Sequence, residues 1–330
     1  MRAYIIKRVL LAVPTLFIVS LIIFVMVRLI PGSVVDAMVA QLDQFAGSDV
    51  QLNRASVEKA LGLDVPIIIQ YGRWWGVLPG VDGSTSGLLQ GDLGNSLWRK
   101  TTVVEDIAGR WPVTIELGIL ALIVAQLIAL PVGVYSALRQ DTGGDYIARS
   151  FAILCIAVPG FWLGTLVVVF PSIWWGYMAP IMKIPFFENP LGNLQMFIAP
   201  SIVLGMVMSG ATMRITRTMM LEVLRQDYIR TAWAKGLKER VVVIRHVLKN
   251  ALIPVITTIG WQLPVLLGGT VIIEEVFNLA GMGRLMIDSV TRRDYPVVAG
   301  IMLLFSAGMV LINLIIDLTY AYLDPRVRYR

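Results

Sequence analysis

The sequence predicts an all-α integral membrane protein with six transmembrane helices and a small extracytoplasmic domain between the first two helices. Of its 330 residues, 57% are hydrophobic and only 15% are charged, whereas a soluble domain carries about 25% charged residues. Its mean hydropathy is +0.74. A helix needs roughly 20 apolar residues to cross a bilayer. Six uncharged stretches meet that length, at residues 9–27, 117–138, 150–182, 189–213, 250–273 and 295–316.

The first stretch is expected to remain in the protein as a transmembrane helix within residues 1–30. Basic residues precede it, as they do in a secretory signal peptide. The stretch is longer than the 7–15 apolar residues of a signal peptide, and no small-x-small cleavage site follows it. An uncleaved helix with a cytosolic N-terminus is therefore the better interpretation.

Residues 31–112 are predicted to form the small extracytoplasmic domain. They mix acidic, basic and aromatic side chains, and glycine recurs among them. Residues 56–63 are expected to form a helix capped by Ser56, with Lys59 on its surface. The piece at 76–91 is rich in Gly and Ser and is typical of an exposed loop.

The third uncharged stretch is longer than one helix requires. Three prolines interrupt it, and Trp174, Trp175 and Tyr177 resemble the aromatic belt of a membrane interface. We expect one helix at about 150–172, followed by an outer loop. Two membrane-crossing helices here would place the basic loop at 214–249 outside, against the positive-inside rule.

The distribution of Lys and Arg predicts that both termini are cytosolic. In that orientation the short outer loops hold four basic residues, and all other basic residues flanking short loops lie inside. The net charge of +6 is explained by this asymmetry rather than by nucleic-acid binding. Residues 113–330 then form a five-helix core that contains the basic loop. Kinks are expected at the prolines within the spans, at positions 14, 131, 159, 200, 254 and 264.

The basic loop is the segment most suggestive of function. Small residues at Thr231, Ala232 and Ala234 would let a short helix approach another surface closely. Gly236 would let the chain leave that helix, as glycine does at helix ends. The loop's basic residues supply charge for a partner or for anionic lipid. These features alone favour a lipid-bound loop and a docking helix about equally.

In its order of residues, the segment Asp227–Leu237 resembles the coupling loop of ABC-importer permeases, in particular the first permease subunit of the dipeptide/oligopeptide/nickel family. Arg230-Thr231-Ala232 stands where the general pattern has Glu-Ala-Ala, and Gly236 matches its glycine. The proline that follows is displaced to Pro254. The resemblance covers nearly the whole chain. Further similar motifs are Arg28-Leu29-Ile30-Pro31-Gly32, Gly91-Asp92-Leu93-Gly94-Asn95-Ser96, Val158-Pro159-Gly160-Phe161-Trp162, Glu274-Glu275-Val276-Phe277, Gly281-Met282-Gly283-Arg284, Arg293-Asp294-Tyr295-Pro296 and Leu323-Asp324-Pro325-Arg326.

The resemblance implies a permease of the ABC-importer type in the cytoplasmic membrane, which translocates di- or oligopeptides. A permease for nickel chelates or another small solute is the alternative. The implied partners are a second permease, two ATPase subunits that use ATP and Mg, an extracytoplasmic solute-binding protein and membrane lipid. The expected ATPase-coupling residues are Asp227, Arg230, Thr231, Ala232, Ala234, Lys235, Gly236 and Leu237.

Catalysis by this chain is not expected. A P-loop needs Gly-Lys followed by Ser or Thr, and no Gly-Lys pair occurs in the sequence. The single histidine, His246, lies among basic residues and cannot build a zinc site alone. Cys155 lies in the third apolar stretch and is interpreted as a packing residue. No metal or cofactor site is therefore predicted in this chain.

Polar side chains within the spans are few and are candidates for the translocation path. Glu116 and Asp317 fall near span ends, where an interfacial position is expected. Gln126, Gln262 and Asn313 lie deeper, and amides at such depth commonly hydrogen-bond between helices. Gln262 and Asn313 are taken as the path candidates. A channel or secondary carrier would explain the spans but not the coupling-loop pattern, and a scaffold would not explain several kinked helices.

Overall fold

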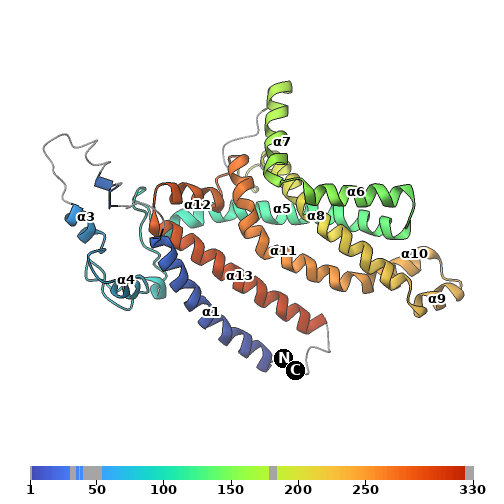
Figure 1. Cartoon of the computed structure of the whole chain (residues 1–330), viewed down its shortest axis with the longest axis horizontal. Helices are drawn as coiled ribbons and strands as arrows, with labels where there is room; N and C mark the ends of the chain where they lie inside the picture. Colours follow the sequence, from blue (N-terminus) through green and yellow to red (C-terminus); the bar gives the residue numbers. More distant parts are fainter. Residues whose placement is uncertain (1, 30–34, 37, 40–53, 178–183, 324–330) are drawn as a thin grey trace. The chain divides into compact units, whose positions relative to one another are not determined.

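The computed structural model describes residues 2–29, 35–36, 38–39, 54–177 and 184–323. Within these ranges the protein is helical and no strand is found. The longer helices are α1 (Arg2–Arg28), α5 (Val103–Leu138), α6 (Gly143–Ala157), α7 (Gly160–Trp175), α8 (Pro190–Leu224), α11 (Lys249–Val276) and α13 (Tyr295–Leu323) (Figure 1). The shorter ones are α3 (Arg54–Ala60), α4 (Ile67–Trp74), η2 (Leu88–Gln90), α9 (Asp227–Ala234), α10 (Glu239–Val241), η3 (Val242–Leu248) and α12 (Met282–Thr291).

Five segments are long and apolar enough to cross a membrane, and a bent pair of helices adds a sixth if it counts as one span. The five are Arg8–Arg28, Val103–Leu138, Pro190–Leu224, Glu239–Pro264 and Tyr295–Ile316; the pair is α6 with α7. The expectation of an all-α membrane protein with about six spans is therefore confirmed.

The single helix expected at 150–172 is wrong. α6 ends at Ala157, α7 begins at Gly160, and their axes differ by 93° (Figure 1). Val158 between them is extended, with φ −80° and ψ 123°. Pro159 explains the break, because a proline lacks the amide donor and its ring disfavours the helical conformation in the preceding residue.

The other spanning prolines act differently. Pro14, Pro131, Pro200, Pro254 and Pro264 all lie inside helices that continue past them. Proline therefore ends a helix at only one of these six positions. Pro159 follows the extended Val158 and directly precedes α7, whereas the other five prolines lie inside continuous helices.

The contacts divide the chain into two compact units, which are described separately. The first consists of Met1–Ile5, Pro112–Arg284 and Leu311–Arg330. Its most buried span is α8, which packs against α6, α7 and α11. The main core joins α5, α8 and α11 through buried side chains such as Leu117, Phe197 and Ile273.

Small residues bring α5 and α8 close together in this unit. Ala121, Ala125 and Ala129 recur every fourth position on α5 and are fully buried. A Cβ added at Gly205 of α8 would lie 2.8 Å from the Ala121 carbonyl oxygen, and one added at Gly133 of α5 would lie 2.9 Å from the Met213 carbonyl oxygen. Such contacts are typical of membrane helices, where van der Waals packing drives association.

The second unit consists of Ile6–Trp111 and Leu285–Val310. There α1 packs against the first part of α13, through Ile23, Val27, Val298 and Ala299. The helix expected at 56–63 is found as α3, which begins earlier, so Ser56 lies inside it rather than at its cap. The Gly- and Ser-rich piece at 76–91 is a loop except for the short helix η2.

Two of the sequence motifs meet inside the second unit. The Asp294 carboxylate accepts hydrogen bonds from Ser96 Oγ at 2.5 Å and from the Leu97 amide at 3.1 Å. Ser96 and Asp294 are both buried. The motif ending at Ser96 and the motif around Asp294 thus form one polar contact, which ties the loop before α5 to the start of α13.

Candidate functional site

The segment between α8 and α11 contains the residues predicted to couple the chain to a partner. The loop expected at 214–249 begins as helix, because α8 continues to Leu224. The short elements α9, α10 and η3 follow it. In the first unit, α9 and α10 lie beyond the end of α8 (Figure 1).

The end of α9 is built around Gly236. The Gly236 amide donates to the Trp233 carbonyl oxygen at 2.9 Å, and the Leu237 amide donates to the Ala232 carbonyl oxygen at 3.4 Å. Gly236 itself has a φ of +79°. This pair of bonds with a left-handed residue is the Schellman motif, which satisfies carbonyl groups at the end of a helix. The prediction that Gly236 lets the chain leave the helix is thus matched by the backbone geometry.

One face of α9 anchors it to the rest of its unit. Ile229 and Ala232 are buried, in a cluster with Ala137 of α5, Met220 of α8 and Val247 of η3. The structure therefore places Ala232 against the chain's own core. A methyl group at this position allows close packing there, so the small size of Ala232 serves the interior and not an outside surface.

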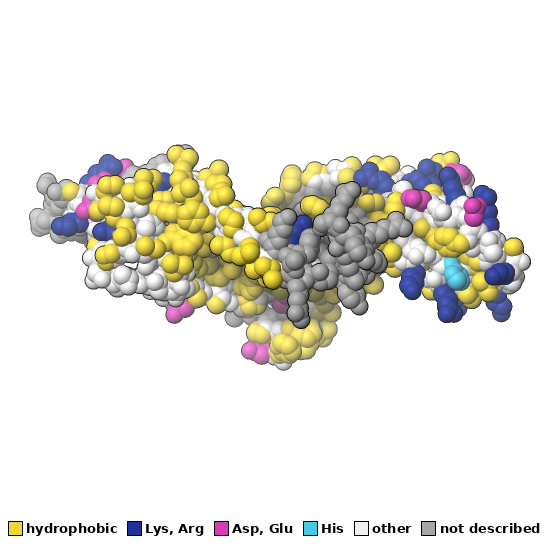
Figure 2. Space-filling view, turned by 90° about the horizontal axis from the view of Figure 1, so that it is seen from below, with side chains coloured by type: hydrophobic (Ala, Val, Ile, Leu, Met, Phe, Trp, Pro, Cys, Tyr) yellow, Lys and Arg dark blue, Asp and Glu magenta, His cyan; other side chains and the backbone are white. Residues whose placement is uncertain are grey.

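The opposite face of α9 is open to solvent. Asp227, Arg230, Thr231, Ala234, Lys235, Gly236 and Leu237 are all exposed. Large apolar side chains accompany them, with Tyr228 46% and Trp233 42% exposed. Figure 2 shows basic side chains gathered around the single histidine, interspersed with apolar ones. Aromatic side chains and arginine are enriched at protein interfaces.

Few polar contacts hold this outer face. Asn250 Nδ2 donates to the Tyr228 hydroxyl at 3.1 Å and to the His246 carbonyl oxygen at 2.8 Å. Arg230 and Asp227 form an ion pair at 3.6 Å, with side chains 72% and 97% exposed. Such a pair contributes little to stability. The exposed side chains are thus free to rearrange while the inner face stays packed.

The connection from η3 into α11 is unusual. Val242–Leu248 adopts π-helical turns and leads directly into α11. Its buried face comprises Val242, Val243 and Val247, which pack in the same cluster as Ile229. π-helical turns are rare and occur often at functional sites. α9 is therefore connected to α11 by a segment whose hydrogen bonding differs from that of an ordinary helix.

A second polar site lies where α11 meets α12. Glu274 Oε2 accepts hydrogen bonds from the Gly283 and Arg284 amides at 2.7 and 3.2 Å. Glu274 Oε1 accepts one from Thr114 Oγ1 at 2.7 Å, and Thr114 Oγ1 accepts one from the Met282 amide at 2.8 Å. The carboxylate thus caps the first turn of α12, whose amides lack partners within the helix. Sequence reasoning noted the two motifs involved and missed their contact.

The two path candidates differ in their surroundings. Gln262 of α11 donates from Nε2 to the Met208 carbonyl oxygen at 3.1 Å and to Thr212 Oγ1 at 2.9 Å. It therefore forms two interhelical hydrogen bonds to α8. Asn313 of α13 is exposed. Their role in a translocation path remains a prediction.

The comparison with known families decides the class of this chain. Residues 129–329 match the family described as "Binding-protein-dependent transport system inner membrane component". Residues 1–118 match the corresponding N-terminal family of membrane components. The chain belongs to this family. It is accordingly a multi-pass protein of the inner membrane and a transport permease, in agreement with its apolar helices.

Relatives match over their full length. A protein of Brucella abortus (strain 2308), named as a candidate peptide transport system permease, is 39% identical over 330 residues and covers 100% of both chains. The glutathione transport system permease protein GsiC of Salmonella paratyphi A is 37% identical, again over 100% of both chains. The same-named protein of Escherichia coli O6:H1 is also 37% identical over the full length of each. This chain is similar to all three.

Proposed function

We propose that this chain is a transmembrane permease subunit of an ATP-driven ABC importer that carries di- or oligopeptides across the cytoplasmic membrane. Its family supports the transport role, and the names of its full-length relatives support peptides as the solute. The observation that carries the mechanism is the construction of α9. One face is packed into the chain, and the other presents exposed aromatic and basic side chains.

The proposed partners are two cytosolic ATPases, a second permease and an extracytoplasmic solute-binding protein. ATP and Mg are used by the ATPases, since this sequence contains no P-loop. α9 docks on an ATPase, with both termini of the chain in the cytosol. Closure of the ATPase dimer on ATP then displaces α9 as a rigid body, and the transporter alternates between two states.

The packing of α9 explains how such a displacement would reach the spans. Ile229 contacts the core formed by α5, α8 and η3, so α9 cannot move without them. Protein interiors are close-packed and transmit strain. α8 and α11 are the spans that continue directly from this core, so we propose that they carry the movement.

The first test is purification of the intact transporter in mild detergent with mass spectrometry. Two ATPases and a second permease should accompany this chain. Their absence under every mild condition would contradict the importer. Identification of the solute that co-purifies with the cognate binding protein tests the peptide assignment separately, because a nickel chelate there would replace the peptide and leave the permease role intact.

The second test examines the docking face. Trp233→Ala should weaken co-purification of the ATPase and lower transport, while membrane insertion stays normal. Phe187→Ala is the matched control, since Phe187 is 96% exposed and lies outside the segment between α8 and α11. Equal ATPase recovery from both variants would argue against docking through α9.

A further inference from the structure

A cavity of about 270 Å³ lies between α5, α6 and α8 in the first unit, and no residue of α9 lines it. Its apolar walls are formed by Val132 of α5, Ala152, Ile153 and Ile156 of α6, and Met213 of α8. Its polar lining comes from Ser136, Arg149, Arg214, Arg217 and Thr218. Three arginines thus line one small cavity whose remaining walls are largely hydrocarbon.

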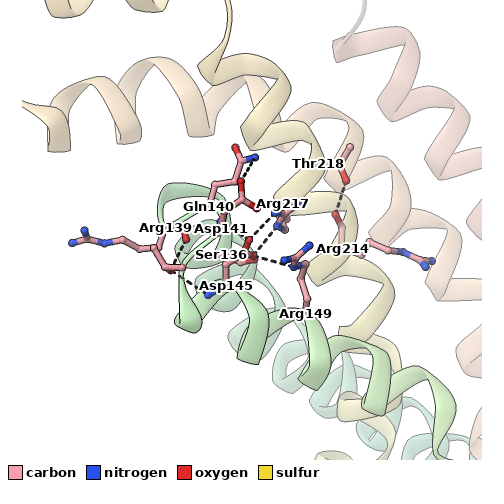
Figure 3. A network of polar contacts seen from close by, with 10 residues as sticks. Ser136, Arg139, Gln140, Asp141, Asp145, Arg149, Arg214, Arg217 and Thr218 are labelled. Atoms are coloured by element: carbon pink, nitrogen blue, oxygen red, sulfur yellow. Dashed lines mark hydrogen bonds and ion pairs between the residues drawn. The ribbon is translucent and has the colours of Figure 1, made fainter.

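Within the described residues, the only carboxylate that forms an ion pair with these arginines is Asp145, and both of its oxygens already accept hydrogen bonds. Arg217 binds it through two bonds, Nε to Oδ1 at 2.9 Å and Nη2 to Oδ2 at 2.8 Å. Ser136 Oγ donates to Oδ1, and the Asp141 amide donates to Oδ2 at 3.0 Å. Figure 3 shows Arg149 and Arg217 converging on this carboxylate from α6 and α8. Asp145 is completely buried, so this arrangement neutralises Arg217.

Arg149 is left with unused hydrogen-bonding capacity. Its Nε lies 3.6 Å from Asp145 Oδ1, too far for a hydrogen bond. Both Nε and Nη2 are buried, and neither has a hydrogen-bond partner within the described residues. A buried donor without an acceptor costs free energy. The guanidinium is also held over the Tyr146 ring, 4.4 Å from its centroid, so it is positioned in advance.

The cavity therefore carries excess positive charge beside an apolar wall. Arg214 lines it as well, and no acidic side chain of the described residues pairs with Arg214. Figure 3 shows Arg214 pointing away from Asp145. Asp145 thus pairs with two of the three guanidinium groups, and Arg214 has no ion pair within the described residues. Guanidinium groups bind phosphate through paired hydrogen bonds, which favours a phosphate group as the missing acceptor.

The surface beside the cavity indicates what carries that phosphate. Ile153 and Ile156, which line the cavity, are 65% and 46% exposed, and Ile147 on the same helix is 73% exposed. In a chain that spans a membrane, this surface suits acyl chains better than water. A basic pocket between transmembrane helices is a recognised place for an anionic lipid headgroup.

We propose that the cavity between α5, α6 and α8 binds the headgroup of an anionic phospholipid. Arg149 donates to the phosphate through its guanidinium, and Arg214 adds charge at the rim. The acyl chains lie along the exposed face of α6. This site is independent of the solute and of the docking role of α9.

The test is native mass spectrometry of the detergent-purified transporter, titrated with phosphatidylglycerol or phosphatidylcholine. The wild-type protein should retain phosphatidylglycerol preferentially. Arg149→Gln should lower its apparent affinity about fivefold, since one basic residue near an anionic lipid contributes that factor. The apparent affinity of the Arg149→Lys variant should lie between those of the wild type and Arg149→Gln. Lysine keeps the positive charge but cannot donate two parallel hydrogen bonds as a guanidinium does. Arg139→Gln is the control, since Arg139 is exposed at the same end of α5 and does not line the cavity.

A second measurement distinguishes weaker lipid binding from misfolding of the Arg149 variants. A photo-reactive residue in place of Ile153 should crosslink to phospholipid in membranes that contain the assembled transporter. Crosslinking to a partner subunit instead would overturn the proposal, because it would show that protein covers the cavity. Equal loss of phosphatidylglycerol in Arg149→Gln and Arg139→Gln, or retention of inorganic phosphate in place of lipid, would overturn it as well.

Discussion

Glu274 and Thr114 lie 160 positions apart, and the Glu274 carboxylate accepts a hydrogen bond from Thr114 Oγ1 at 2.7 Å. The same carboxylate caps α12, through the Gly283 and Arg284 amides. One side chain therefore joins α5, α11 and the start of α12. Both carboxylate oxygens are in use, so the contact links the turn after α11 to α5.

Replacing Glu274 by Ala should loosen the first turn of α12. The change leaves the Gly283 and Arg284 amides without a buried acceptor, at a cost of about 1–3 kcal/mol. Hydrogen exchange of a peptide covering α12 should therefore be roughly tenfold to a hundredfold faster. Glu275→Ala is the control, because Glu275 is the next residue and is exposed. Equal exchange in both variants would show that the carboxylate does not hold α12.

The same turn should reject a methyl group at Gly283. A Cβ there would lie 2.4 Å from the Val271 Cα, so backbone has to move. Gly283→Ala should lower the free energy of unfolding of the detergent-solubilised protein by about 1–3 kcal/mol, as overpacking does. A lower unfolding temperature would report this loss. Gly268→Ala on α11 is the matched control, since a Cβ there meets no atom within 4 Å. A fall in stability for both variants alike would point to a cause other than this close approach.

Sequence reasoning was most successful where a local rule decides the structure. The apolar stretches, the helix near residue 56 and the turn at Gly236 follow from hydropathy and from the backbone freedom of glycine. Pro159 shows the limit of such rules. Proline predicts a disturbance at six positions, and only the tertiary setting decides that one of them breaks the helix while the others are absorbed.

Long-range partners could not be predicted. Asp145 is bonded to Arg217 on another helix, and nothing local marks Asp145 as the buried member of the pair. The inward direction of Ala232 was missed for the same reason, because the helical face that is buried depends on where α5 and α8 pack. The segment proposed to couple the chain to an ATPase was singled out through its order of residues rather than through its charge.

Substitutions at Gly236 should separate backbone effects from packing effects. A Cβ at this position meets nothing within 4 Å, while φ is +79°. Gly236→Val should therefore destabilise the end of α9 through backbone strain, at a cost of roughly 1–2 kcal/mol in conformational free energy. Gly236→Asn should cost much less, since Asn tolerates the left-handed region. ATP hydrolysis and uptake, measured together in proteoliposomes, should become uncoupled in the Val variant. Normal transport by that variant would contradict the proposed role of α9.

The Asp145–Arg217 pair should matter far more than the exposed Asp227–Arg230 pair. Asp145 is fully buried and bonded twice to Arg217, whereas the other pair stands at 3.6 Å in solvent. Asp145→Asn leaves two guanidinium groups facing each other without a counter-charge, which costs about 3–5 kcal/mol for a buried pair. We expect a large fall in the unfolding temperature and little expressed protein, while Asp227→Asn changes neither measurably.

Because Arg149 shares the carboxylate, Arg149→Gln combined with Asp145→Asn should lower the unfolding temperature by less than the sum of the two single changes. Additive losses in that double variant would show that Arg149 and Asp145 act independently, despite the 3.6 Å between them.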